Sequence, residues 1–99
     1  MEERQALSAF YALSQETRLR ILRLLVVAGP EGLAAGVIAQ RVAASASNIS
    51  FHLKELEIAT LVSARRQGRS IIYVAQHDTL SALIRFLLDD CCSGLLEAG

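Results

Sequence analysis

Two adjacent cysteines near the end of the sequence, Cys91 and Cys92, are its strongest candidates for chemistry. Soft thiolate sulfur selects soft ions, and trivalent arsenic and antimony are thiophilic. Adjacent side chains on a helix point about 100° apart, so both sulfur atoms can reach one ion only if that turn loosens. Ser93 and Gly94 follow directly and make unwinding easy. The pair therefore predicts a metalloid site, with a thiol–disulfide redox switch and ordinary buried thiols as the alternatives.

A polar segment in the middle of the chain has the residue types that read DNA. Ser45 and its neighbours offer a helix N-cap, after which Ile49, Leu53 and Leu56 recur at i, i+4 and i+7 and define a buried face. Small polar side chains on the opposite face suit base edges in a major groove about 12 Å wide. An ordinary solvated helix face is the alternative. The residues predicted to contact DNA here are Ser47, Asn48, Ser50, Phe51, His52 and Lys54, the last two through phosphates.

A basic hairpin is predicted directly after this segment. The β-prone runs 62–66 and 70–74 bracket a Gln-Gly-Arg turn. Basic side chains at a hairpin tip can hold the phosphate backbone or enter the minor groove. A solvated charge cluster is the alternative, but the polar helix and the basic hairpin together favour DNA. The arginines predicted to bind DNA are Arg65, Arg66 and Arg69.

The remaining segments that must position these residues have helical periodicity. Helices are predicted over 2–13, 15–28, 34–43 and 78–90, with Ser14 as the N-cap of the second. Two short helices joined by a few residues form a helix-turn-helix. The predicted fold is therefore mainly α with a β-hairpin (α+β): a winged helix-turn-helix whose first and last helices pair in a homodimer. The apolar stripes are Leu7, Phe10 and Tyr11; Leu19, Leu22, Leu25 and Val26; Val37, Ile38 and Val42; and Leu80, Leu83, Ile84, Leu87 and Leu88.

The composition predicts a single domain, 1–99, that associates with a second copy. A hydrophobic fraction of 53% is high for 99 residues, and a subunit interface would cover the excess apolar surface. No run is long enough to span a bilayer, and the acidic start does not resemble a signal peptide. We therefore expect a cytoplasmic protein without membrane contact. The net charge of zero argues against a general polyanion binder, but the stretch from Arg41 to Arg69 contains five basic residues and only two acidic ones.

Other titratable residues give no pattern of a reaction centre. For Arg18 the alternatives are support of the polar helix, contact with phosphate, or an ion pair with Glu16 or Glu57. His77 is expected to cap the last helix or to lie at the surface. The two histidines, with no paired carboxylates and no phosphate-binding glycine loop, predict that the protein is not an enzyme and requires no cofactor. A protein-interaction module, in which the hairpin meets an acidic partner, is the alternative of another class.

Three motifs in this order resemble the ArsR/SmtB repressors. Residues 13–22, LSQETRLRIL, are similar to the family's second helix, L-x-x-x-x-R-L-x-I-L. Residues 47–56, SNISFHLKEL, contain the S-x-H-L-x-x-L core of its recognition helix, and residues 65–73, RRQGRSIIY, resemble its wing. The resemblance covers nearly the whole chain. It implies a homodimer that blocks a promoter by binding a palindromic operator in double-stranded DNA, and that releases the DNA when a toxic metal or metalloid binds.

The inducer sites of two branches of that family are missing. Residues 36–41 contain no Cys-x-Cys motif, and residues 79–90 contain no histidine for zinc. Some arsenic-responsive members instead carry a vicinal pair like Cys91 and Cys92, followed by a third cysteine that residues 93–99 lack. The resemblance thus implies that arsenite, methylarsenite or antimonite is the inducer, with the partner subunit as a further source of sulfur.

Overall fold

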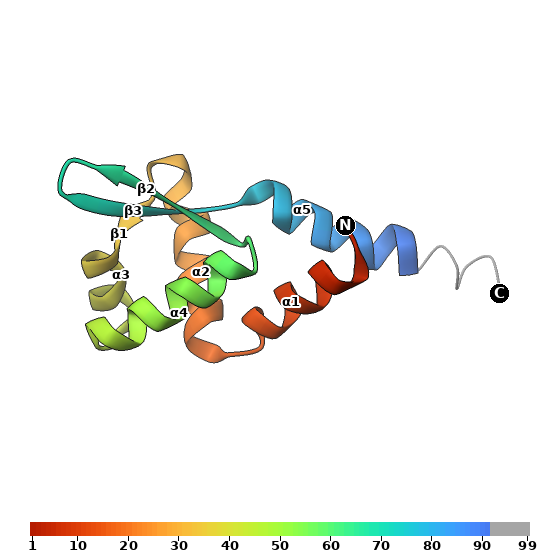
Figure 1. The fold of residues 1–99 in the computed structure, drawn as a ribbon, viewed down its shortest axis with the longest axis horizontal. Coiled ribbons are helices and arrows are strands. Elements are labelled where there is room, and N and C mark those ends of the chain that lie inside the picture. The colour runs from red at the N-terminus through yellow and green to blue at the C-terminus, as the bar shows by residue number, and fades with distance from the viewer. Residues whose placement is uncertain (92–99) are drawn as a thin grey trace.

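The computed structural model describes residues 1–91, with side chains as far as residue 88. Figure 1 shows the order of the elements, which confirms the predicted series of four helices, a hairpin and a last helix. The elements are α1 (Glu3–Leu13), α2 (Glu16–Ala28), a 3-10 turn (Gly29–Glu31), β1 (Leu33–Ala34), α3 (Ala35–Val42), α4 (Ala46–Ile58), β2 (Val62–Gln67), β3 (Ser70–Ala75), α5 (His77–Arg85) and a π-helical segment (Phe86–Cys91). Helices α3 and α4 form the expected helix-turn-helix.

Strand β1 is an addition to the predicted hairpin. The sheet is antiparallel in the order β1-β3-β2, and β1 pairs Leu33 with Tyr73. Gly32 makes this pairing feasible because its φ is +66°, and a Cβ there would lie 2.4 Å from the carbonyl oxygen of Tyr73. Only glycine fits so close to another backbone. A strand of two residues is too short to show a period of two in the sequence.

The core lies between the helices and the inner end of the sheet. The predicted buried face of α4 is confirmed, since Ile49, Leu53 and Leu56 are at most 1% exposed. Burial of each such side chain contributes about 1.5–3 kcal/mol. The largest fully buried side chains are Ile21, Leu25, Ile38, Ile49, Leu53, Leu56 and Leu61.

Helix α1 buries only part of its apolar stripe, because Phe10 alone of the three is half-buried against the core. Its buried residues are Ala6, Ala9 and Ala12, whereas Leu7 and Tyr11 are 61% and 68% exposed. Alanines allow the backbone of α1 to approach its neighbours closely, and the larger side chains then fall on the outer stripe. Apolar periodicity could not distinguish the two stripes.

Two assignments for α2 are also corrected. Leu22 and Leu25 are buried as expected, but Leu19 and Val26 are 43% and 40% exposed. Ile21 and Arg18 take their places inside. The N-cap is Gln15, whose side chain accepts a hydrogen bond from the backbone N–H of Arg18. The predicted cap, Ser14, instead ends α1, because its backbone N–H and its hydroxyl both donate to the carbonyl of Tyr11.

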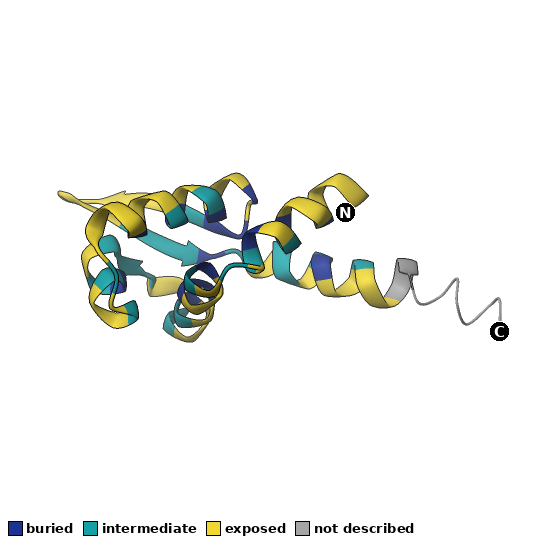
Figure 2. Ribbon diagram, turned by 90° about the horizontal axis from the view of Figure 1, so that it is seen from below, coloured by how far each residue is buried: buried dark blue, intermediate teal, exposed yellow. Residues whose placement is uncertain are grey.

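The predicted stripes of α3 and α5 are only partly buried. In α3, Ile38 is buried, while Val37 and Val42 are half-buried. In α5, Leu83 is buried and Leu80 half-buried, because only the first turns reach the body of the protein. Figure 1 shows α5 projecting from that body, and Figure 2 shows mostly exposed residues towards its end. The exposed members of the stripe are Ile84, Leu87 and Leu88, at 58%, 41% and 60%. Within the described part of the chain, no helix is long and apolar enough to cross a membrane.

Candidate nucleic-acid interface

Helix α4 presents a polar, exposed stripe because its other side is fixed in the core. The helix starts at the predicted cap, where the hydroxyl of Ser45 accepts a hydrogen bond from the N–H of Asn48 at 3.3 Å. With the buried leucines and isoleucine opposite, residues at i, i+3, i+4 and i+7 face solvent together. Phe51 is 57% exposed, unusually open for an aromatic side chain. The exposed residues predicted to contact DNA on this helix are Ser47, Asn48, Ser50, Phe51 and Lys54.

The remaining predicted contact, His52, is half-buried and has a partner inside the protein. Its Nδ1 lies 3.1 Å from Nη1 of Arg18, which is only 6% exposed. The Nε of the same arginine donates to the carbonyl oxygen of Ala12 at 2.7 Å, and its guanidinium lies 5.8 Å from the centroid of the Tyr11 ring. Arg18 therefore connects the end of α1, the start of α2 and the exposed helix α4.

The contact with Arg18 fixes the protonation of His52. A guanidinium can only donate, so Nδ1 must accept and the neutral ring carries its proton on Nε2. Burial and the charge of Arg18 lower the pKa of His52 below its ordinary value of 6.5, against an opposing effect of Glu55. His52 thus offers a neutral Nε2–H donor, which has no partner among the described residues. Such a donor can still bind a phosphate oxygen.

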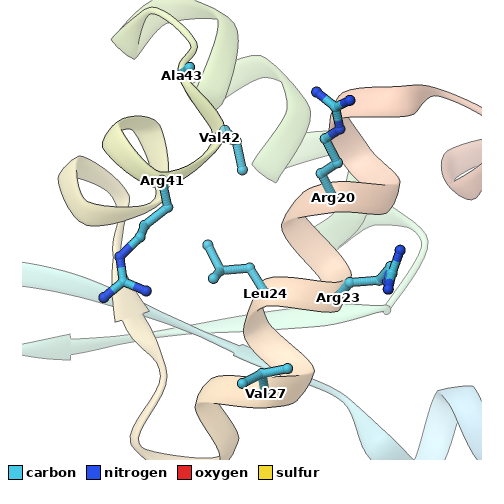
Figure 3. Close-up of a pocket in the computed structure, with 7 residues that line it drawn as sticks. All are labelled: Arg20, Arg23, Leu24, Val27, Arg41, Val42 and Ala43. Carbon is cyan, nitrogen blue, oxygen red and sulfur yellow. The ribbon is translucent and has the colours of Figure 1, made fainter.

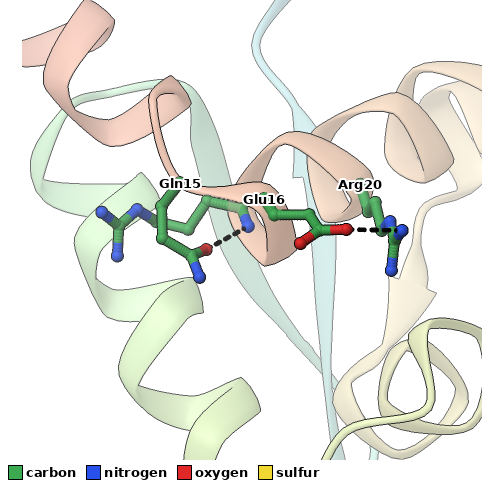
Figure 4. A network of polar contacts seen from close by, with 4 residues as sticks. Gln15, Glu16 and Arg20 are labelled. Carbon is green, nitrogen blue, oxygen red and sulfur yellow. Dashed lines mark hydrogen bonds and ion pairs between the residues drawn. The ribbon is translucent and has the colours of Figure 1, made fainter.

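The ion pairs considered for Arg18 do not form. Figure 4 shows that Glu16 instead pairs with Arg20, with 2.6 Å between Oε1 and Nη2, one helical turn further along α2. Support of the polar helix is therefore the role that the structure gives Arg18. The signal for a buried arginine was its place in the L-x-x-x-x-R-L-x-I-L pattern, since its charge by itself indicated the surface.

The three arginines of the β2–β3 hairpin have different surroundings. Arg65 donates from Nη1 to the carbonyl of Pro30 and from Nη2 to that of Glu31, both at 3.0 Å. This predicted DNA contact thus anchors the hairpin to the turn after α2. Arg66 and Arg69 are exposed and make no ion pair in the described residues. A tight two-residue turn begins at Gly68, whose φ of +64° suits a type II′ hairpin.

The exposed stripe and the hairpin lie at the same end of the molecule. Figure 1 shows the start of α4 and the tip of the hairpin together there, while α5 extends towards the other end. The elements that carry the small polar groups, the exposed aromatic ring and the exposed guanidinium groups thus lie at one end of the molecule. Such groups together can bind phosphates and contact base edges.

The predicted metalloid site lies at the limit of the structure. Cys92 is outside the described residues, as is the side chain of Cys91. Among the side chains that are described, no three His, Cys, Asp or Glu residues are grouped so that they could hold a metal ion. His77 lies at the surface as expected.

Comparison with known proteins identifies relatives over most of the chain. Residues 13–63 match the model of a helix-turn-helix domain family. Nodulation protein NolR of Rhizobium meliloti is 36% identical over 78 residues, which are 79% of this chain and 62% of NolR. The chain thus spans less than two thirds of that relative. These similarities include both helices of the helix-turn-helix.

Solved structures extend the similarity to the hairpin and the flanking helices. An ArsR-like transcriptional regulator from Rhodococcus sp. RHA1 superposes with a TM-score of 0.83 at 32% identity, covering 95% of this chain and 86% of that one. The homodimeric winged helix-turn-helix DNA-binding domain of Mb0332 from Mycobacterium bovis gives 0.69 at 30%, covering 87% and 80%. Such proteins are transcriptional regulators and not enzymes, in agreement with the prediction from the sequence.

Proposed function

The chain belongs to the helix-turn-helix family as a winged transcriptional regulator of the ArsR type, and from this membership we propose that it is a homodimeric repressor of transcription that binds operator DNA. The observation that carries the proposal is the exposed polar stripe of α4 at the same end of the molecule as the exposed arginines of the hairpin. Helix α4 enters the major groove, where Asn48 pairs with adenine and Phe51 contacts a thymine methyl group. Arg66 and Arg69 neutralise phosphates or enter the minor groove.

Dimer formation through α1 and α5 accounts for the apolar surface that one copy leaves open. Leu7 and Tyr11 on α1 and Ile84 on α5 are all more than half exposed. Large apolar side chains exposed on both flanking helices favour an association site there. A two-fold dimer presents two copies of α4, so the operator is palindromic, with half-sites about 34 Å or one helical turn apart.

The inducer in this proposal is a trivalent arsenic or antimony species bound by Cys91 and Cys92. The support is chemical, since this vicinal pair holds the only thiols of the chain, and thiolates select soft ions. Binding changes the last helix at the dimer interface and thereby the spacing of the two α4 helices. A hundredfold loss of operator affinity requires a coupling free energy of only about 2.7 kcal/mol.

The test measures fluorescence anisotropy of a labelled duplex taken from the DNA upstream of the protein's own coding region. We expect binding about a thousandfold tighter than to a scrambled duplex, as for other sequence-specific regulators. Equal affinity for the two duplexes would contradict operator recognition and favour the protein-interaction alternative. Adding phenylarsine oxide or arsenite to the complex should release the DNA.

Substitution at the cysteines separates the inducer from the DNA-binding function. Cys91→Ser/Cys92→Ser should bind the operator normally and keep it when arsenite is added. Release from this variant by arsenite would overturn the assigned inducer site but not the repressor. Release of the wild-type complex by hydrogen peroxide alone, reversed by a thiol reductant, would instead identify a redox switch.

A further inference from the structure

Arg18 is the one charged residue that is buried in the described part of the chain, at 6% exposed. The other arginines of α2 extend outwards: Arg20 and Arg23 are exposed, and their guanidinium groups point in different directions in Figure 3. Burial of a charge is costly unless the group is paired and hydrogen-bonded. Arg18 therefore has to be held by its surroundings, and these surroundings decide what its side chain can do.

Neutral groups hold Arg18 and fix the direction of its guanidinium. Its Nε donates to the carbonyl oxygen of Ala12 at 2.7 Å, and its Cζ lies 5.8 Å from the centroid of the Tyr11 ring. Its backbone N–H donates to the side chain of Gln15 at 2.9 Å. No acidic side chain among the described residues forms an ion pair with it. With Nε bound to α1, the guanidinium presents Nη1 to α4.

On α4 the guanidinium contacts one ring and, through that ring, a second one. Nη1 of Arg18 lies 3.1 Å from Nδ1 of His52. The ring of His52 is in turn in T-shaped contact with the exposed ring of Phe51, with 5.3 Å between the centroids and 63° between the planes. Aromatic rings favour this arrangement. Because Arg18 occupies Nδ1, only the Nε2–H of His52 is left to donate to DNA.

We propose that Arg18 is a positioning residue for operator recognition, which orients the ring of His52 and, through it, the ring of Phe51 without touching the DNA. The inference rests on the proposed repressor function, which assigns both rings to the DNA contacts. Linked hydrogen bonds polarise one another, so donation to Nδ1 also strengthens Nε2–H as a donor to a phosphate oxygen. Rings that are held before DNA arrives lose less conformational freedom on binding.

The first experiment is a double-mutant cycle on operator affinity, measured with the labelled duplex of the repressor test. Arg18→Gln should weaken binding about fivefold and His52→Ala about tenfold, each close to the loss of one hydrogen bond. The double variant should bind no more weakly than His52→Ala, because without the ring Arg18 has no route to the DNA. An additive loss of about fiftyfold would overturn the proposal.

Two further variants separate orientation from charge. Arg20→Gln removes the same charge from an exposed position of α2 and should leave operator affinity unchanged. Arg18→Lys keeps the charge but lacks the planar fork that donates in two directions, so it should weaken binding about as much as Arg18→Gln. Wild-type affinity in Arg18→Lys would overturn the positioning role. Circular dichroism checks that each variant is folded, and Arg18→Lys replaces Arg18→Gln in the cycle if the latter unfolds.

An NMR titration of the His52 ring tests the contact without DNA. Arg18 and Glu55 are the charged groups that act on this ring. In Arg18→Gln the pKa of His52 should rise from its lowered value towards 6.5, because the charge of the guanidinium is gone. Arg20→Gln should leave the pKa as in the wild type. An unchanged pKa in Arg18→Gln would overturn the assigned contact, whereas equal affinity of the wild type for operator and scrambled duplexes would overturn the proposed function.

Discussion

Nη1 of Arg18 lies 3.1 Å from Nδ1 of His52, across 34 positions of sequence, and so connects α2 with the helix proposed to enter DNA. The same guanidinium donates through Nε to the carbonyl oxygen of Ala12. That carbonyl is among those left unpaired at the end of α1, where a positive charge also interacts favourably with the helix dipole. One buried side chain thus joins the proposed dimer helix to the DNA-contacting helix.

Replacing Arg18 should therefore lower the stability of the folded protein. Arg18→Ala removes two hydrogen bonds and leaves the buried carbonyl of Ala12 unpaired, so we expect the free energy of unfolding to fall by about 2–3 kcal/mol. Urea denaturation followed by circular dichroism measures it. Arg20→Ala, which removes only an exposed ion pair, should cost about 0.5 kcal/mol. Similar losses in both variants would show that the buried contacts contribute nothing beyond a surface charge.

Stability should depend on pH through His52. Because its pKa is lowered in the folded protein, the unfolded chain binds this proton more readily. The contribution of neutral His52 to the free energy of unfolding is complete above the ordinary pKa of 6.5 and decreases as the pH falls through that value. Urea midpoints across this range should show the decrease. His52→Asn keeps an acceptor near the position of Nδ1 without titrating, and should flatten the curve, while His77→Asn should not.

The exposed ring of Phe51 should matter for DNA and not for folding. Phe51→Ala removes a side chain that is 57% exposed, so unfolding should change little. Operator affinity should fall by about 1 kcal/mol, or about fivefold, through loss of an apolar base contact. Ile58→Ala is the control, since Ile58 is 63% exposed at the other end of α4. If both variants bind the operator like the wild type, the assigned groove-facing stripe is wrong.

Substitutions of the hairpin arginines should change the salt dependence of DNA binding, and those at Arg65 should also change stability. Arg69→Ala should weaken binding to all sequences and reduce the slope of log affinity against log salt by about 0.9 for one lost phosphate contact. Arg65→Ala should also lower stability, because Arg65 holds the turn at Pro30 and Glu31. Unaltered salt slopes in both variants would remove the hairpin from the DNA interface.

Two glycines with similar backbone angles should respond differently to substitution. Gly32→Ala places a Cβ 2.4 Å from the carbonyl oxygen of Tyr73 in addition to its positive φ, and we expect a loss of about 3 kcal/mol. Gly29 has a φ of +73° but no neighbouring atom within 4 Å, so Gly29→Ala should cost only about 1 kcal/mol of backbone strain. Thermal unfolding of both variants measures the difference. Equal losses would mean that the contact with β3 relaxes freely.

The sequence by itself determined the helices, the hairpin and the buried face of α4. Ile49, Leu53 and Leu56 recur at helical spacing after a serine cap, and these local patterns depend only on the geometry of one helix. The glycine turn between two β-prone runs likewise fixed the hairpin. The DNA-contact residues are positions on those elements, so most of the candidate interface could be predicted as well.

Only the tertiary structure decided which apolar stripe faces inwards and which arginines bind other groups of the protein itself. Leu7 and Tyr11 are larger than the alanines of α1, yet they are exposed while Ala6, Ala9 and Ala12 are buried, since close helix packing selects small side chains. Arg18 and Arg65 read as surface charges, but Arg18 contacts the ring of His52, 34 positions away, and Arg65 donates to the carbonyl oxygen of Pro30, 35 positions away. Folding brings such partners together from positions too far apart in the sequence for a local periodic pattern to indicate.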